Sequence, residues 1–240
     1  MSIVDNVTPG QQSRALWLST VAFTTCFAVW TIFSIIGLQI QKDLGLSETE
    51  FGLLIGTPIL SGSLIRLVLG IWSDQYGGRI IYTIVMVTAA IATFLLTTVD
   101  TYVMYLVAAL GIGIAGGSFA VGIAYTSRWF PTEKQGTALG IFGLGNVGAA
   151  VTKFTAPFVM VAFGWHAVAQ IWGAALLLMA AIFWFVSDDE PMLKARRLSG
   201  AKPDSFMKQL EPLKNMQVWR FSLYYFCVFG AFVALALWLP

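Results

Sequence analysis

The sequence contains few charged residues and few residues that carry out chemistry. Charged residues make up 11% of the 240 positions, against roughly 25% in soluble domains, and the formal net charge is only +2. This charge is too small for a nucleic-acid-binding surface. The chain has two cysteines, both in apolar segments, and one histidine, His166. Because this histidine lies at a connection between apolar segments, the segments themselves cannot assemble a Ser-His-acid triad or a histidine-based metal site. We therefore expect no enzyme: no catalytic site, no metal and no cofactor.

Apolar residues, by contrast, dominate the composition. Hydrophobic residues make up 58% of the sequence and include 18 Phe and 9 Trp, more apolar surface than a soluble core can hide. A helix that crosses a bilayer needs about 20 predominantly apolar residues. The sequence therefore predicts an all-α polytopic membrane protein with six spans and the start of a seventh near Val218. The six predicted spans are residues 15–38, 51–72, 80–98, 101–127, 136–163 and 165–186.

The distribution of lysine and arginine predicts the orientation of these spans. An N-terminal segment (1–14) precedes the six-helix bundle (15–186), and a long, charged, proline-containing linker (187–217) separates the bundle from the seventh span (218–240). On one side of the predicted membrane the loops hold only Lys42. By the positive-inside rule, the N-terminus and the linker are cytoplasmic. The other basic loop residues are Arg14, Arg79, Arg128, Lys134, Lys194, Arg196, Arg197, Lys202, Lys208 and Lys214. Short loops and the absence of a targeting segment favour a bacterial inner membrane.

Three basic residues fall inside the predicted spans, whereas all 12 acidic residues fall outside them. A lone cation in the bilayer is costly unless it faces a wet cavity or an anion, so the simplest explanation is an anionic ligand. Arg66 lies deep in the second span, and its planar guanidinium suits an oxyanion. Arg220 lies near the end of its span and is expected to extend to the interface. For Lys153, extension to the interface, pairing with a group beyond this chain and a functional role all stay open.

Glycine is concentrated in the fourth and fifth predicted spans. Gly136, Gly140 and Gly143 fall on one helical stripe, which predicts close approach of a neighbouring backbone. Asn146 and Lys153 are two turns apart on a neighbouring stripe, so an amide and a cation are suited to line a substrate path. The glycines of both spans match G-x-G-x-x-G, but no strand precedes either match. A dinucleotide site is therefore excluded.

The loop between the second and third spans reads GIWSDQYGGR over residues 70–79. It resembles the cytoplasmic signature of the major facilitator superfamily, G-x-x-x-D-R-x-G-R-R. Gln75 and Gly78 stand where the superfamily has basic residues, so we expect a weaker charge network between the two halves of the protein. The residues that match the signature are Gly70, Asp74, Gly77 and Arg79. The resemblance implies the N-terminal six-helix bundle of a twelve-span fold and a seventh helix, with the C-terminal half missing from this sequence.

A narrower resemblance is to the nitrate/nitrite porter family, whose fifth helix has a glycine-rich G-x-G-N-x-G core. The similarity runs from about Ala15 to the end of the chain. The segments that carry it are GSLIR (62–66), GGSF (116–119), WFP (129–131), GTALG (136–140), GLGNVG (143–148) and YYFCVFG (224–230).

This resemblance implies roles for individual residues. Arg66 would bind the substrate, with Phe119 and Phe229 on either side of a planar anion and Tyr225 as hydrogen-bond donor. Tyr224 is the alternative if the register differs by one. A lysine at position 153 resembles the symporter-like branch of the family. Lys153 is therefore a candidate for substrate binding or coupling. The residues implied to let the fifth helix slide against its neighbours are Gly140, Gly143, Gly145, Gly148 and Asn146.

The implied function is nitrate transport by alternating access, as nitrate/proton symport or nitrate/nitrite antiport. The expected partners are nitrate, nitrite or protons, and the lipid bilayer, and the expected oligomeric state is a monomer. Because the C-terminal half is expected to be needed for function, this chain alone should not transport. Two alternatives stay open: a transporter of another small anion in the same superfamily, and a membrane sensor or assembly subunit that does not transport.

Overall fold

The computed structural model describes residues 7–201 and 205–238, which contain helices and no strands. The remaining parts of the predicted N-terminal segment, linker and seventh span lie outside the described residues, and Lys202 is among them. Over the described residues, seven helical stretches are long and apolar enough to cross a membrane, so the predicted multi-span fold is confirmed. These stretches are Pro9–Leu44, Glu48–Tyr76, Gly78–Leu95, Tyr102–Ser127, Thr132–Phe163, Trp165–Val186 and Met216–Leu237.

Local breaks divide three of these stretches into shorter elements. Two short 3-10 segments, η2 and η3, interrupt the fourth and fifth spans within their glycine-rich parts. The elements are α1 (Pro9–Trp30), α2 (Phe33–Leu44), α3 (Glu48–Tyr76), α4 (Gly78–Leu95), α5 (Tyr102–Gly113), η2 (Ile114–Gly117), α6 (Ser118–Ser127), α7 (Thr132–Gly143), η3 (Leu144–Val147), α8 (Gly148–Phe163), α9 (Trp165–Val186), α10 (Pro191–Ser199), α11 (Phe206–Gln209), η4 (Glu211–Lys214) and α12 (Met216–Trp238).

Polar side chains cap the first turns of α1 and α3, and both helices begin before the predicted spans. At the start of α1, the Thr8 side chain accepts from the Gln11 backbone N–H, and the Gln11 side chain accepts from the Thr8 N–H. Ser47 and Glu50 make the same reciprocal pair at the start of α3. Such pairs satisfy backbone donors that have no partner inside the helix. The helices therefore extend into sequence that hydropathy alone assigns to loops.

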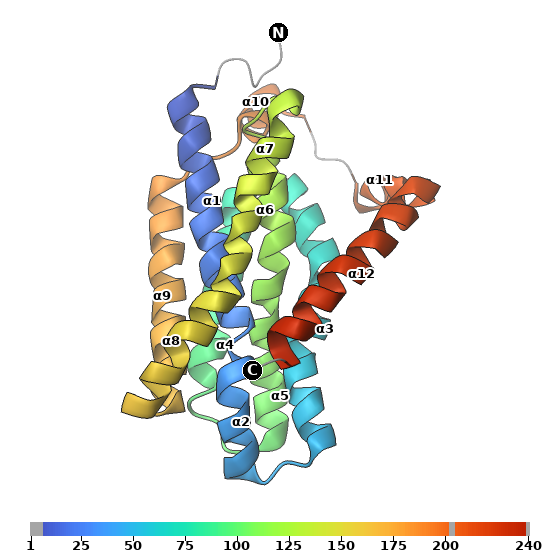
Figure 1. Ribbon diagram of the computed structural model, residues 1–240. Helices are drawn as coiled ribbons and strands as arrows, with labels where there is room; N and C mark the ends of the chain where they lie inside the picture. Colours follow the sequence, from blue (N-terminus) through green and yellow to red (C-terminus); the bar gives the residue numbers. More distant parts are fainter. Residues whose placement is uncertain (1–6, 202–204, 239–240) are drawn as a thin grey trace.

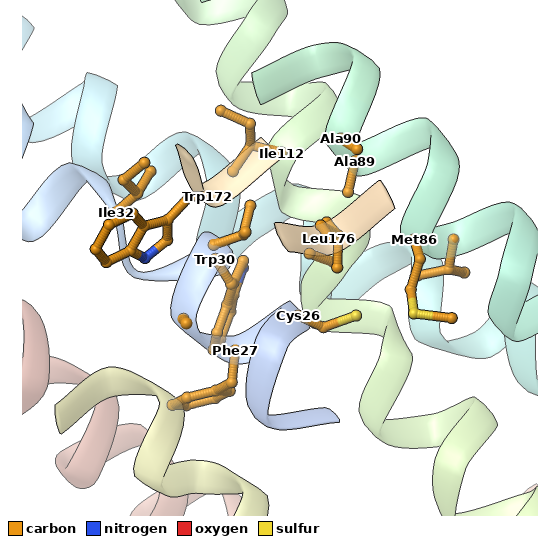
Figure 2. Close-up of a cluster of buried hydrophobic side chains, with 14 of the residues drawn as sticks. Cys26, Phe27, Trp30, Ile32, Met86, Ala89, Ala90, Ile112, Trp172 and Leu176 are labelled. Carbon is orange, nitrogen blue, oxygen red and sulfur yellow. The ribbon is translucent and has the colours of Figure 1, made fainter. Parts of the chain in front are cut away.

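The first six spans form a bundle with an aromatic and aliphatic core, and α12 leans away from it (Figure 1). Figure 2 shows the middle of that core, where side chains from four spans meet. Trp30 of α1 is fully buried there, with Met86 of α4, Ile112 of α5 and Leu176 of α9. Because Trp30 lies at the end of α1, next to the break before α2, its indole reaches both the core and the neighbouring α3.

The predicted linker is not extended throughout. Its first part forms α10, which lies at the same end of the bundle as the starts of α1 and α7 (Figure 1). Leu193 of α10 is buried, and so is Glu190, which immediately precedes the helix. The segment therefore packs back onto the six-helix bundle before the chain continues to α11, η4 and α12.

Candidate functional site

Arg66 lies well inside α3, and its guanidinium is surrounded by aromatic rings. The Arg66 Cζ lies 5.7 Å from the ring centre of Trp30, 5.5 Å from that of Phe119 and 5.2 Å from that of Phe229. Its Nε donates to the Gly116 carbonyl over 3.1 Å. Within the described parts of the chain, Arg66 has no carboxylate within salt-bridge distance. The ring faces attract the cation, but no carboxylate of the described residues neutralises it.

Glycines let α3, which carries Arg66, pack closely against the end of α5 and against Trp30. A Cβ at Gly62 would lie 2.6 Å from the Gly113 carbonyl oxygen and 2.9 Å from the Trp30 Nε1. A side chain at this position would therefore separate α3 from α5 and from Trp30. The Trp30 Nε1 in turn donates to the Pro58 carbonyl of α3 over 2.9 Å. These contacts hold the indole beside Arg66, a role for Trp30 that the sequence analysis missed.

Two aromatic residues one turn apart on α12 face this site. Tyr225 and Phe229 stack on each other with ring centres 5.0 Å apart, and Phe119 of α6 stacks on them at 6.0 and 6.2 Å. Tyr225 also has an electrostatic interaction with the Arg66 guanidinium. Tyr224 is 56% exposed and contacts Phe221 edge-on. The structure thus brings together Arg66, Phe119, Tyr225 and Phe229, and places Tyr224 outside the group.

The guanidinium opens into a cavity of about 1010 Å³ between α3 and α12. Arg66, Ser63 and Tyr225 line it together with Trp30 and Phe229, and most of the remaining lining is apolar. A cavity of this size exceeds what a small ion fills. It is suited to be a path that leads to the guanidinium.

Two other candidates lie apart from this group. Asn146 is not among the residues that line the cavity in the described chain, and its Nδ2 donates to the Gly143 carbonyl over 2.8 Å. Lys153 is half-buried on α8 and is also absent from the lining. Their proposed roles stay predictions.

The predicted close approach along Gly136, Gly140 and Gly143 is wrong for the described chain. No atom lies within 4 Å of a Cβ built at any of these three positions. The tight contacts occur instead at Gly145, against the Phe23 ring, and at Gly148, against the backbone of α1. Gly145 and Gly148 therefore face α1, whereas Gly136, Gly140 and Gly143 face open space in the described chain.

The loop signature forms a dense polar network with α6, α9 and α10. Asp74 pairs with Arg128, whose guanidinium also contacts the buried Glu190 carboxylate at 3.0 Å. The same carboxylate accepts from the Gly78 N–H over 2.8 Å. Gly77 adopts φ +102°, a conformation that favours glycine, and a side chain there would overlap Leu193. Gly70 has no atom within 4 Å of its Cβ position, so nothing in the described chain requires glycine there.

Arg79, the last residue of the signature, binds the end of α9. Its guanidinium donates to the Trp184 carbonyl over 2.5 Å, lies 4.8 Å from the Trp184 ring centre and is 3.9 Å from an Asp189 oxygen. Sequence reasoning missed Arg128, Asp189 and Glu190 as members of this network. The available signal was the acidic run 188–190 next to Pro191, on the basic side of the predicted membrane.

The buried carboxyl of Glu190 is expected to make the stability of the folded chain depend on pH. Burial raises the pKa of its carboxyl above the ordinary value of 4.5, against the opposing effects of Arg128 and the Gly78 N–H. The folded state therefore binds this proton more tightly than the unfolded chain, so the stability from this group falls as pH rises from 4.5 toward the folded-state pKa. We expect the Tm of Glu190→Gln to fall less than that of the wild type over this window, as measured by thermal unfolding in detergent. Identical pH profiles would contradict the assignment.

The sequence model of the Major Facilitator Superfamily matches residues 18–240. The chain belongs to the major facilitator superfamily. A solved structure has a similar fold. A bacterial homologue of the human lysosomal transporter Spinster, in an inward-facing and unoccupied conformation, superposes with a TM-score of 0.65 at 19% identity, over 77% of this chain and 44% of that one. This likeness concerns the fold alone.

Curated relatives from within the superfamily carry related names. A probable nitrate/nitrite antiporter of Thermus thermophilus is 43% identical over 95% of this chain and 53% of its own length. A nitrite extrusion protein of Bacillus subtilis is 31% identical over 96% of this chain and 56% of its own. The similarity to nitrate/nitrite porters that the sequence predicts is thus confirmed. The chain spans about half the length of the curated relatives it matches.

Proposed function

We propose that this chain supplies one half of the substrate path of a nitrate/nitrite transporter, in which Arg66 binds the anion. The observation that carries the proposal is a guanidinium deep in a membrane-capable helix, among three aromatic rings and facing a cavity, with no carboxylate partner in the described chain. A buried cation without a carboxylate is costly, and an anionic substrate offsets that cost. The names of the relatives supply the choice of anion.

The chemistry of nitrate suits this arrangement. Nitrate is planar, singly charged and weakly hydrated, so a planar guanidinium and flat rings can replace its water without large loss. The guanidinium offers two parallel N–H donors to two oxygens of a planar oxyanion. Phe119 and Phe229 would restrict the anion to one plane, and Tyr225 would donate to the third oxygen. Asn146 and Lys153 would contribute to substrate binding or coupling from the fifth span, and the signature glycines would let that span slide against its neighbours.

Transport would proceed by alternating access, with this half rocking against another about a site near the middle of the membrane. The N-terminus and the linker would lie in the cytoplasm and the spans in a bacterial inner membrane, with the protein acting as a monomer. The cytoplasmic network of Asp74, Arg128 and Glu190 would hold this half as one body. Both nitrate/proton symport and nitrate/nitrite antiport are compatible with such a movement.

The proposal is tested in proteoliposomes with a protein of the relatives' full length that contains this chain. Labelled nitrate uptake is measured with internal nitrite or with an imposed proton gradient. We expect saturable uptake that excess chloride or phosphate does not reduce. Uptake that survives collapse of the proton gradient when nitrite is inside assigns antiport, and uptake that needs the gradient assigns symport. Competition by chloride or phosphate, or nitrate binding without flux, would contradict the proposal.

A further inference from the structure

A second cavity, of about 600 Å³, lies at the end of the bundle that carries α10. Its walls come from the end of α3, the start of α4 and three residues of α10, Leu193, Arg196 and Arg197. The wall is apolar on one side, where Trp72, Ile80 and Ile84 line it, and cationic on the other, where Arg196 and Arg197 line it. This cavity is separate from the one that Arg66 lines.

The acidic residues beside α10 neutralise only part of its charge, because most of their ion pairs are with basic residues outside the helix. Asp188 pairs with Arg14 and Glu190 with Arg128, while Asp189 is shared between Arg79 and Arg197. Arg196, in contrast, donates within the described chain to backbone carbonyls, those of Asp74 at 2.8 Å and Gln75 at 2.6 Å. Among the described residues no carboxylate lies within salt-bridge distance of Arg196 or of the exposed Lys194. The cavity thus keeps an excess of positive charge.

The apolar wall continues onto the outer surface of the bundle. Trp72 is 42% exposed, Ile84 is 50% exposed and Tyr76 is 56% exposed, all on helices able to span a membrane. Exposed aromatic side chains at the end of a span are typical of the interface between headgroups and acyl chains. The two guanidinium groups would therefore lie at headgroup depth and the isoleucines at the depth of the first acyl carbons.

We propose that this cavity binds one anionic phospholipid, with its phosphate at Arg196 and Arg197 and the start of an acyl chain against Ile80 and Ile84. Basic pockets at the ends of membrane spans bind anionic headgroups. A free phosphate would use the two arginines but would leave the apolar wall uncovered. The amphiphilic lining, and its position at the bilayer edge, favour the lipid. The bound lipid would join α10 to the ends of α3 and α4 that carry the loop signature.

The test measures retention of single lipids on the purified chain in non-ionic detergent by native mass spectrometry. The probes are phosphatidylglycerol and phosphatidylcholine with the same acyl chains. We expect preferential retention of phosphatidylglycerol, and a loss of about fivefold for Arg196→Gln and for Arg197→Gln, the factor typical of one basic residue near an anionic surface. Lys134→Gln, an exposed charge at the start of α7 and at the same end of the bundle, is the control and should retain the lipid as the wild type does.

Arg196→Lys separates lipid binding from a structural role. Lysine keeps the charge near the phosphate but cannot reach both backbone carbonyls, so we expect nearly normal retention if the charge binds the lipid. Loss in Arg196→Lys equal to that in Arg196→Gln would overturn the proposal, as would equal retention of the two lipids by the wild type. Displacement of phosphatidylglycerol by excess inorganic phosphate or glycerol 3-phosphate would assign a free-anion site instead and would also overturn it. None of these readings depends on nitrate transport.

Discussion

Replacing Arg66 with lysine is expected to abolish nitrate flux, although the charge of the side chain is retained. Lysine loses the two parallel donors that match a planar oxyanion, as well as the Nε–H that donates to the Gly116 carbonyl. Its compact ammonium also cannot stack flat against Trp30, Phe119 and Phe229 as a guanidinium does. One lost charge-assisted hydrogen bond costs about 2 kcal/mol, which weakens nitrate binding roughly 30-fold.

The measurement is labelled nitrate uptake by full-length protein in proteoliposomes, with nitrate binding to the same protein measured by calorimetry. Arg220→Lys is the matched control, because Arg220 is exposed, donates to the Gln217 Oε1 over 3.3 Å and is not among the residues that line the cavity in the described chain. We expect normal flux in that variant. Normal flux and binding in Arg66→Lys would show that Arg66 has a structural role only, and the anion site would have to be sought elsewhere.

Two glycines of one signature are expected to respond in opposite ways to the addition of a single methyl group. At Gly148 a Cβ would overlap the Thr24 carbonyl and lie 2.8 Å from the Ala28 nitrogen, both backbone atoms of α1 that cannot move alone. At Gly140 a Cβ meets nothing within 4 Å. Overpacking costs about 1–3 kcal/mol, whereas glycine to alanine in an open helix gains up to about 1 kcal/mol.

We therefore expect Gly148→Ala to lower the Tm of the purified chain and Gly140→Ala to leave it unchanged or raise it. For a chain of this size each kcal/mol corresponds to a shift of about 2–4 °C. Thermal unfolding in detergent, followed by tryptophan fluorescence, compares the two variants directly. A Tm for Gly148→Ala equal to that of Gly140→Ala would contradict the contact between α8 and α1.

The sequence predicted the spans and the central residue of the site. Both follow from the free-energy cost of placing polar or charged groups in the hydrocarbon core of a bilayer. Apolar runs of bilayer length identify the helices whatever they pack against. Arg66 stands out for the same reason, since a lone guanidinium in such a run needs a partner. The aromatic partners Phe119, Tyr225 and Phe229 were predicted only through resemblance to a family, because an aromatic residue in a span is otherwise an ordinary core residue.

The contacts around α10 could not be predicted in the same way. Asp189 and Glu190 read as members of a charged linker, because nothing in a charge run shows which basic residues it will meet after folding. Trp30 is similar: its buried indole, fixed by the Pro58 carbonyl, depends on the break between α1 and α2 and on the approach of Gly62. Both features rest on pairings between distant segments, which local patterns of hydropathy do not encode.

The 3-10 segment η3 changes the angular phase of the fifth span. A 3-10 helix turns about 120° per residue where an α-helix turns about 100°, so four residues rotate everything beyond them by roughly 80°. A continuous helical wheel therefore misplaces Gly148 by almost a quarter turn, and the actual phase puts Gly145 and Gly148 on the face opposite Gly140. Conversion of η3 to a regular α-helical turn would rotate Lys153 and the rest of α8 by the same angle relative to α7. The fifth span therefore consists of two helices, α7 and α8, whose faces are rotated relative to each other at η3. A change in the conformation of η3 would rotate α8 about its own axis without moving α7.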